Sequence, residues 1–544
     1  MQEGSKFIKG ALILTIANII VKILGAVYRF PLYNILGREG MGLFMAVYPL
    51  YSMMLSISTA GVPLAVSKLV SEKIALDNYE GARQVFRVAL TLMLASGLIV
   101  TGVLMLAAPH YSANMLKVSR ALYPLLAIAP SIVFYAVKAS FRGFFQGQQR
   151  MEPSAVASIV EQLVRVGTIF LLASILIKYS LELGAAGAAF GSVTGAAAGL
   201  IWLLIVYFRS APEYNRLASL SAENSLQPTK RVIKDIFALA LPITIGSIIV
   251  PVVNMVDSTL ILPRLQAGGF SEDAALALQG IFSGAAMSLV NMPTIFTMAL
   301  GTALLPAVAR AYASKQLNII KGLSSLSIRM GQIIGLPSAI GLFVLAEPIS
   351  IFLYNDLAVA RPLSVAAFAA IFISLNQTTS PVLQGLGKTY LPVSHMFCGL
   401  LIKVTINYFL TPIPSINILG PAFGTIIAFA LASFLNLRAI KKLVGGGISI
   451  TESFVKPSLN AILMGLSVYF LYPLFQRLAF ILLNSWLSQR FIVGAAVIVA
   501  IGVGIVVYGI ATLMTGTISR SELELIPVIG PKLAKILTRL KLLR

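Results

Sequence analysis

The chain has 544 residues, of which 58% are hydrophobic and 11% are charged, and its mean hydropathy is +0.90. This composition excludes an ordinary water-facing surface and means that lipid must solvate most of the chain. The formal net charge of +22 would favour nucleic-acid binding in a soluble protein, but the positions of the basic residues favour a membrane topology and no nucleic-acid partner. The one cysteine, Cys398, excludes a disulfide framework and a thiol-based metal site.

Apolar stretches of roughly twenty residues, the length that crosses a bilayer as a helix, recur along nearly the whole chain. They predict an all-α polytopic membrane protein of about 14 transmembrane helices. The first stretch, Phe7 to Val27, continues into Tyr28 and Pro31 without a small-residue cleavage site, so we interpret it as a span and not as a signal peptide. The predicted spans centre near residues 18, 55, 97, 130, 167, 197, 248, 291, 335, 372, 402, 430, 465 and 502.

Lysine and arginine are distributed unevenly between the two sides that fourteen spans would create. If the amino terminus is cytoplasmic, roughly 27 of the 41 basic residues fall in cytoplasmic segments, about 8 in outer loops and about 6 in the spans. The outer loop around Pro412 and Pro414 has no Lys or Arg. This bias predicts a multi-pass membrane protein with both termini in the cytoplasm.

The longest polar interruption runs from Arg209 to Lys234 and is rich in Pro, Asn and Ser, as expected of a connector. Six predicted spans precede it. We therefore predict an N-terminal lobe with its connector over 1–225, a C-terminal lobe of six spans over 226–445, two extra helices over 446–516 and a basic tail over 517–544. The tail is predicted to be an amphipathic helix on the inner leaflet, with a solvated basic end as the alternative.

Short motifs recur in the same order on the two sides of this connector, about 230 to 245 residues apart. The sequence GAAFG at 187–191 returns as GPAFG at 420–424, FQG at 145–147 as LQG at 383–385, and VPLAV at 62–66 as LPAV at 305–308. Six spans per copy would make both copies enter the membrane in the same sense. The sequence therefore predicts two pseudo-symmetric six-helix lobes, with a pathway at their interface.

A cation exposed to lipid at the bilayer centre costs about 3 kcal/mol. The basic residues inside the predicted spans are therefore expected to face a hydrated interior or to be paired with acids. Lys22 and Arg29 are seven residues apart and are predicted to share a face of the first span. In the fifth span Glu161 and Arg165 are four residues apart and are expected to pair. The excess of cations predicts binding of an anionic group of the phosphate or pyrophosphate class. The candidate substrate-binding residues are Lys22, Arg29, Lys138, Arg142, Glu161 and Arg165.

A second group of polar residues lies in the predicted C-terminal lobe. Asp257 and Arg264 share a face of the seventh span, and Lys403 and Asn407 share a face of the eleventh. If Asp257 approaches Lys403, the cluster could serve ion coupling or could be a buried structural pair, and the sequence leaves both open. No metal is expected there.

The sequence shows no catalytic constellation. Its two histidines, His110 and His395, are far apart and neither has metal-ligand spacing. No phosphate-binding glycine-rich loop is evident. We therefore expect neither an enzyme nor a bound cofactor.

Over all but its tail the chain resembles the multidrug/oligosaccharidyl-lipid/polysaccharide (MOP) flippase superfamily, most closely the lipid II flippase branch of the MurJ and SpoVB/YtgP type. The segments that carry the resemblance are KILG at 22–25, RFPLYNILGREG at 29–40, TAGVPLA at 59–65 and FRGFFQGQ at 141–148. The resemblance implies a V-shaped pair of lobes that open alternately to either side and export a lipid-linked peptidoglycan precursor from the inner to the outer leaflet of a bacterial cell membrane. It also implies that the last two spans form a groove for the isoprenoid tail and that the pyrophosphate meets the basic residues of the first lobe.

Three functions remain open at this point. The first is translocation of a lipid-linked anionic precursor, with lipid II or another undecaprenyl-linked glycan as cargo, driven by the membrane potential or by a coupling cation. The second is multidrug export, which would be expected to present acids to cationic compounds. The third is a scaffold that recruits cell-wall enzymes and transports nothing.

Overall fold

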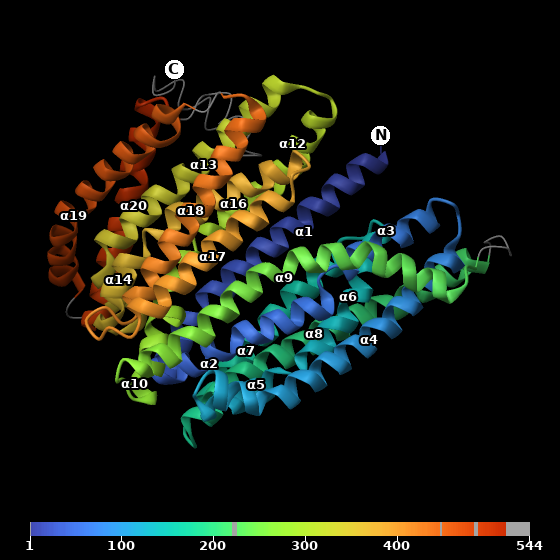
Figure 1. The fold of residues 1–544 in the computed structure, drawn as a ribbon, viewed down its shortest axis with the longest axis horizontal. Helices are drawn as coiled ribbons and strands as arrows, with labels where there is room; N and C mark the ends of the chain where they lie inside the picture. Colours follow the sequence, from blue (N-terminus) through green and yellow to red (C-terminus); the bar gives the residue numbers. More distant parts are fainter. Residues whose placement is uncertain (1, 220–225, 447–448, 484–487, 518–544) are drawn as a thin grey trace. The chain divides into compact units, whose positions relative to one another are not determined.

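The computed structural model describes residues 2–219, 226–446, 449–483 and 488–517. In these ranges the chain is nearly all helical and has no β-strand (Figure 1). Thirteen of the described helices are long and apolar enough to cross a membrane, or fourteen if one bent pair is counted as a single span. The predicted all-α fold is confirmed. The predicted amphipathic tail lies outside the described residues.

The chain divides into two compact units, Met1–Gly280 and Ile281–Arg544. The helices of the first unit are α1 Gln2–Val27, α2 Arg29–Thr59, α3 Val62–Ile74, α4 Tyr79–His110, α5 Leu122–Ile128, α6 Ser131–Gly147, α7 Glu152–Leu176, α8 Leu181–Ser219, α9 Thr229–Ala267 and α10 Glu272–Gln279. The unit therefore extends beyond residue 225, because α9 packs along α2 and α3. The pseudo-symmetric division at 225/226 stays a prediction.

The second unit contains the remaining helices. They are α11 Met287–Asn291, α12 Thr294–Ala313, α13 Leu317–Val344, α14 Ala346–Tyr354, α15 Ala360–Ala366, α16 Ala369–Gly385, α17 Tyr390–Leu410, α18 Leu419–Val444, α19 Lys456–Leu483 and α20 Gln489–Met514. The two helices that were predicted to be additional, α19 and α20, pack on each other, and α19 also packs on α13.

Several predicted spans are broken in ways that hydropathy does not reveal. Gly37, inside α2, has φ 69° and ψ −175°, a left-handed backbone that kinks the helix and suits glycine. A break at Met292 and Pro293 separates α11 from α12, and α15 meets α16 at a bend of 45°. Pro63 lies in the first turn of α3, where its missing N–H costs nothing and the helix is not kinked.

The repeated motifs make similar contacts in the two units. A Cβ on Gly147 of α6 would lie 2.7 Å from Val70 Cβ of α3, and one on Gly385 of α16 would lie 2.8 Å from Val308 Cβ of α12. In each copy a glycine thus packs on a valine at a close helix crossing. The motif counterpart of Val308 is Val66, which packs on Gly143, so this contact is one helical turn out of register with the motif match.

Candidate functional site

A cluster of charged and polar side chains lies between α6 and α7 in the first unit. Lys138 Nζ donates a hydrogen bond to Glu161 Oε2, and Arg165 Nη2 donates to Glu161 Oε1 at 2.5 Å. The Tyr135 hydroxyl donates to the same Oε1 at 2.5 Å and accepts from Arg165. The Lys138 ammonium also lies 4.1 Å from the centre of the Tyr135 ring. One carboxylate is thus shared by two cations and a phenol.

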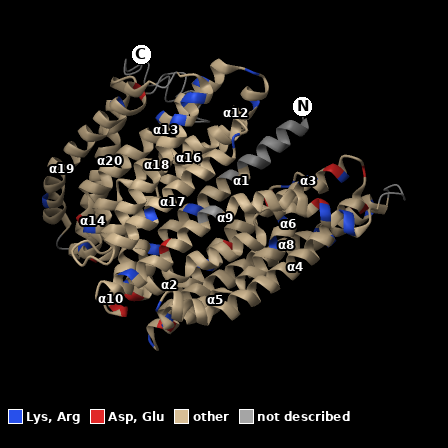
Figure 2. Cartoon of the chain, viewed as in Figure 1, with Lys and Arg blue, Asp and Glu red and all other residues tan. Residues whose placement is uncertain are grey.

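The cluster is buried within the protein. The side chains of Lys138 and Glu161 are 4% and 11% exposed, and that of Arg165 is 16% exposed. Small residues of α8 allow this packing, since a Cβ on Gly195 would lie 2.7 Å from the Glu161 carbonyl oxygen. Helix α8 therefore covers the polar face of α7 at close range. In Figure 2 most other charged residues gather near helix ends.

The cluster keeps an excess of positive charge and of hydrogen-bond donors. Arg142 follows Lys138 by one turn on α6 and is half-buried. With this neighbour the cluster comprises three cations and one acid, for a net charge of +2. The Nε atoms of Arg142 and Arg165 and the Nε2 atom of Gln162 are buried and have no hydrogen-bond partner among the described residues. Buried donors normally have acceptors, so the cluster is chemically suited to an anion with several oxygens.

Two other predicted residues lie at the junction of α1 and α2. Lys22 is exposed on α1, and Arg29 is half-buried as the first residue of α2. Between these helices Tyr28 is buried, and a Cβ on Gly25 of α1 would lie 3.7 Å from Gln162 Nε2 of α7. The end of α1 therefore approaches the α6–α7 cluster. A common face for Lys22 and Arg29 stays a prediction, because the helix is interrupted between them.

The second predicted group is divided between the two units. Asp257 and Arg264 are half-buried on α9 in the first unit, whereas Lys403 and Asn407 are buried on α17 in the second. A Cβ on Gly424 of α18 would lie 2.5 Å from Asn407 Oδ1 and 3.2 Å from Lys403 Cγ. The GPAFG motif therefore packs directly on this pair. The expected approach of Asp257 to Lys403 stays a prediction.

Sequence reasoning correctly paired Glu161 with Arg165 but missed other members of the cluster. Tyr135 precedes Lys138 by three residues, and Gln162 precedes Arg165 by three. That spacing places each beside its cation on one helix face, and it could have been used. A polar network in the second unit was also missed: His395 Nδ1 lies 2.7 Å from Asn436 Oδ1, and Asn436 Nδ2 donates to Thr379 Oγ1 at 3.2 Å.

A cavity lies wholly within the second unit. Its volume is about 880 Å³, and α13, α14, α15 and α19 supply its walls. Phe343, Tyr469, Phe470 and Pro473 give it a largely apolar and aromatic lining, with Glu347 and Arg361 also present. Such a cavity can accommodate a hydrocarbon chain.

These features define a polytopic membrane transporter, because the spans are apolar and a buried cationic cluster lies among them. The chain belongs to the polysaccharide biosynthesis protein family, whose model matches residues 7–312, more than half of the sequence. The family model MatE matches residues 242–409. The chain is thus a MOP-superfamily flippase.

Curated relatives and a solved structure agree with this placement. The chain is 29% identical to stage V sporulation protein B of Bacillus subtilis (strain 168) over 448 residues, which cover 82% of this chain and 86% of the relative. It is 27% identical to lipid II flippase MurJ of the same organism, over 80% of this chain and 81% of the relative. A solved structure of lipid II flippase MurJ in an inward closed conformation has a similar fold, with a TM-score of 0.66, 16% identity, and coverage of 93% of this chain and 98% of that one.

Proposed function

We propose that this protein translocates a lipid-linked cell-wall precursor, with lipid II as the cargo, from the inner to the outer leaflet by alternating access. The observation that carries the proposal is the α6–α7 cluster, where Lys138 and Arg165 share the single acid Glu161 and Arg142 lies one helical turn from Lys138. A pyrophosphate carries negative charge on several acceptor oxygens, and guanidinium groups bind such oxyanions through paired hydrogen bonds.

Two further observations support a lipid-linked cargo. The relative lipid II flippase MurJ carries this substrate in its name. The aromatic cavity of about 880 Å³ beside α19 offers an apolar surface for part of an isoprenoid chain. In this proposal the headgroup and the tail are held by different regions of the chain, so the charged group can cross a polar pathway while the hydrocarbon stays in lipid.

The test is rescue of a bacterial strain depleted of its own lipid II flippase, with inner-leaflet lipid II as the readout. We expect the wild-type chain to restore growth and to prevent accumulation of the precursor. Arg142→Gln combined with Arg165→Gln should reduce export at least about tenfold, because two charge-assisted contacts to the phosphate are lost.

The matched control is Arg209→Gln, which removes an exposed arginine near the end of α8 and should leave export unchanged. Membrane levels of each variant must be equal for the comparison to hold. Full export by the double variant would eliminate the α6–α7 cluster as the headgroup site. Failure of the wild-type chain to rescue, with normal insertion, would argue for another lipid-linked glycan as cargo.

Multidrug export is the second candidate, and the match to the MatE family favours it. Cationic drugs would require exposed acids in the pathway, whereas the α6–α7 cluster has a net charge of +2. Efflux of a cationic dye that continues unchanged when precursor synthesis is blocked would reverse this ranking.

A further inference from the structure

The first unit contains a cavity that is separate from the α6–α7 cluster. This cavity plays no part in the proposed transport. Its volume is about 340 Å³, and it lies where α3, α6 and α8 end and α4 begins. The lysine and arginine bias predicts that this end of the unit faces the cytoplasm. The cavity is thus at the level expected for lipid headgroups.

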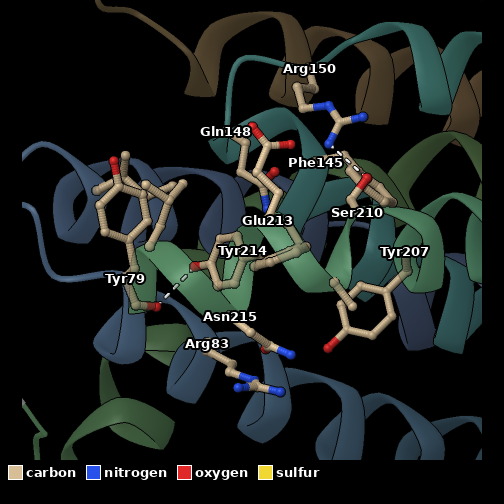
Figure 3. A pocket seen from close by; sticks show the side chains of 14 residues that line it. Tyr79, Arg83, Phe145, Gln148, Arg150, Tyr207, Ser210, Glu213, Tyr214 and Asn215 are labelled. Atoms are coloured by element: carbon tan, nitrogen blue, oxygen red, sulfur yellow. Dashed lines mark hydrogen bonds between the residues drawn. The ribbon is translucent and has the colours of Figure 1, made fainter. Parts of the chain in front are cut away.

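Aromatic side chains form one part of the cavity lining. Tyr214 of α8 lies 5.3 Å from Phe144 and 6.0 Å from Tyr79, measured between ring centres. The Tyr214 hydroxyl donates to the Tyr79 carbonyl oxygen at 2.9 Å, which fixes the start of α4 on α8 (Figure 3). Tyr207 completes this wall. Aromatic residues with a polar edge favour the membrane interface, where one side is apolar and the other is wet.

Polar and charged groups form the remainder of the lining. In Figure 3, Arg150 and Arg83 flank Tyr214 from opposite sides. Arg150 donates to Ser210 Oγ at 2.9 Å and lies over the Phe145 ring at 5.7 Å. These contacts hold the guanidinium in one orientation, which lowers the entropy lost when it binds an anion.

The charges around the cavity do not balance. Arg83 lies 3.9 Å from Glu80, a long contact, and Glu80 also lies 3.6 Å from Arg87. Among the residues that line the cavity, Arg83 and Arg150 are two cations and Glu213 is one acid, for a net charge of +1. One singly charged phosphodiester would neutralise them.

We propose that this cavity binds the headgroup of an anionic phospholipid, with Arg83 and Arg150 holding the phosphodiester and Glu213 accepting hydrogen bonds from a glycerol hydroxyl. A zwitterionic lipid has no net charge and would leave the excess cation unbalanced. The volume lies near the lower limit of ligand pockets, roughly 300 to 1,000 Å³, so it suits a small headgroup and excludes a bulky glycan. Cytoplasmic-side basic pockets between membrane helices are suited to anionic lipids.

The experiment is native mass spectrometry of the full-length protein, delipidated in detergent and titrated with dioleoyl phosphatidylglycerol or dioleoyl phosphatidylcholine. We expect the wild type to retain phosphatidylglycerol preferentially. Arg83→Gln combined with Arg150→Gln should weaken that retention about tenfold, as expected for the loss of charge-assisted hydrogen bonds. Arg87→Gln is the matched control, because it removes a 59% exposed arginine of the same helix that does not line the cavity, and its retention should match the wild type.

A second variant keeps the proposal testable if the double variant misfolds. Asn215→Asp is nearly isosteric, lines the same cavity and adds a negative charge, so it should also lower retention of phosphatidylglycerol. Equal retention of the two lipids by the wild type, or unchanged selectivity in both cavity variants, would overturn the proposal. So would complete displacement of phosphatidylglycerol by glycerol 3-phosphate, which would identify a site for a soluble phosphate. Precursor export should persist in these variants, so this proposal and the proposed function fail separately.

Discussion

Glu161 is the residue on which the α6–α7 cluster depends. It is the one acid that Lys138 and Arg165 both contact, and Arg142 also feels its charge. Removing one partner from a buried ion pair leaves an uncompensated charge, which is far more costly than losing an exposed pair. We therefore infer that this acid stabilises the cations inside the protein. Because it neutralises only one of them, the remaining positive charge can still bind an anion.

We predict that Glu161→Gln lowers the free energy of unfolding by about 3 kcal/mol, because the buried Lys138 and the partly buried Arg165 lose their shared counter-charge. Thermal unfolding in detergent measures the effect. Glu152→Gln is the control, since Glu152 is exposed in the first turn of the same helix, and it should change stability little. Adding Lys138→Met to Glu161→Gln should restore part of the loss by removing one uncompensated cation. Equal stability of Glu161→Gln and the wild type would contradict the role assigned to this acid.

Only part of this cluster could be predicted from the sequence. The contact between Glu161 and Arg165 follows from a spacing of four residues within one helix. The contact between Lys138 and Glu161 joins two helices, and it depends on their relative register, which spacing along the chain does not encode. The approach of Gly25 to Gln162 likewise depends on how α1 meets α7.

At the scale of helices, hydropathy predicted the spans because lipid contact imposes apolar composition on each one. It did not predict where spans break, since Gly37 and the bend between α15 and α16 are set by local backbone and packing. Hydropathy also did not predict where two helices come into close contact. A Cβ on Gly42 of α2 would lie 2.0 Å from the Leu276 carbonyl oxygen of α10, a contact that no sequence signal marks.

We predict that Gly42→Ala destabilises the protein by roughly 1 to 3 kcal/mol, because the added methyl group meets rigid backbone and must push α2 and α10 apart. Gly102→Ala is the matched control: Gly102 is also helical, and a Cβ there would meet nothing within 4 Å. That variant should be neutral or slightly stabilising, since alanine has the higher helix propensity. Thermal unfolding of the two variants side by side tests the prediction, and equal midpoints would contradict it.

At one end of the first unit, the ionic contacts of Arg120 join three segments. Arg120 contacts Glu272 Oε1 at 2.9 Å and Glu182 Oε1 at 3.6 Å, and it also pairs with Asp273. The loop before α5 is thereby connected to the first turns of α8 and α10. An arginine shared by three acids holds these turns together more specifically than single exposed pairs would.

We predict that Arg120→Gln speeds amide hydrogen exchange in α10 several-fold, because the first turn of that helix loses its only basic partner in the described part of the chain. Lys178→Gln serves as the control, since it removes an exposed charge shortly before α8. Exchange measured by mass spectrometry should change in α10 and should stay constant in α7. Unchanged exchange in α10 would mean that helix packing alone fixes it.

At the scale of the whole molecule, the predicted repeat relates a cation of the first unit to a cation of the second. Gly191 of α8 packs on Arg165 and Ile169 of α7, and its repeat counterpart Gly424 packs on Lys403 and Asn407 of α17. Arg165 and Lys403 therefore occupy equivalent positions. The sequence contained this equivalence, but it became evident only once the contacts of both glycines were known.

We predict from this equivalence that Lys403→Gln reduces precursor export, as Arg165→Gln does, because each copy of the repeat would contribute one cation to the anionic headgroup during the transport cycle. Lys403→Arg should preserve export, since a guanidinium keeps the charge and also binds phosphate. Lys388→Gln is the control, because it removes a half-buried cation of the turn before α17, outside the pair that Gly424 contacts. The measurement is inner-leaflet lipid II in the flippase-depleted strain at matched membrane levels. If Lys403→Gln exported normally while Arg165→Gln failed, the headgroup would depend on the cation of the first copy alone, and the repeat would be equivalent in packing but not in substrate binding.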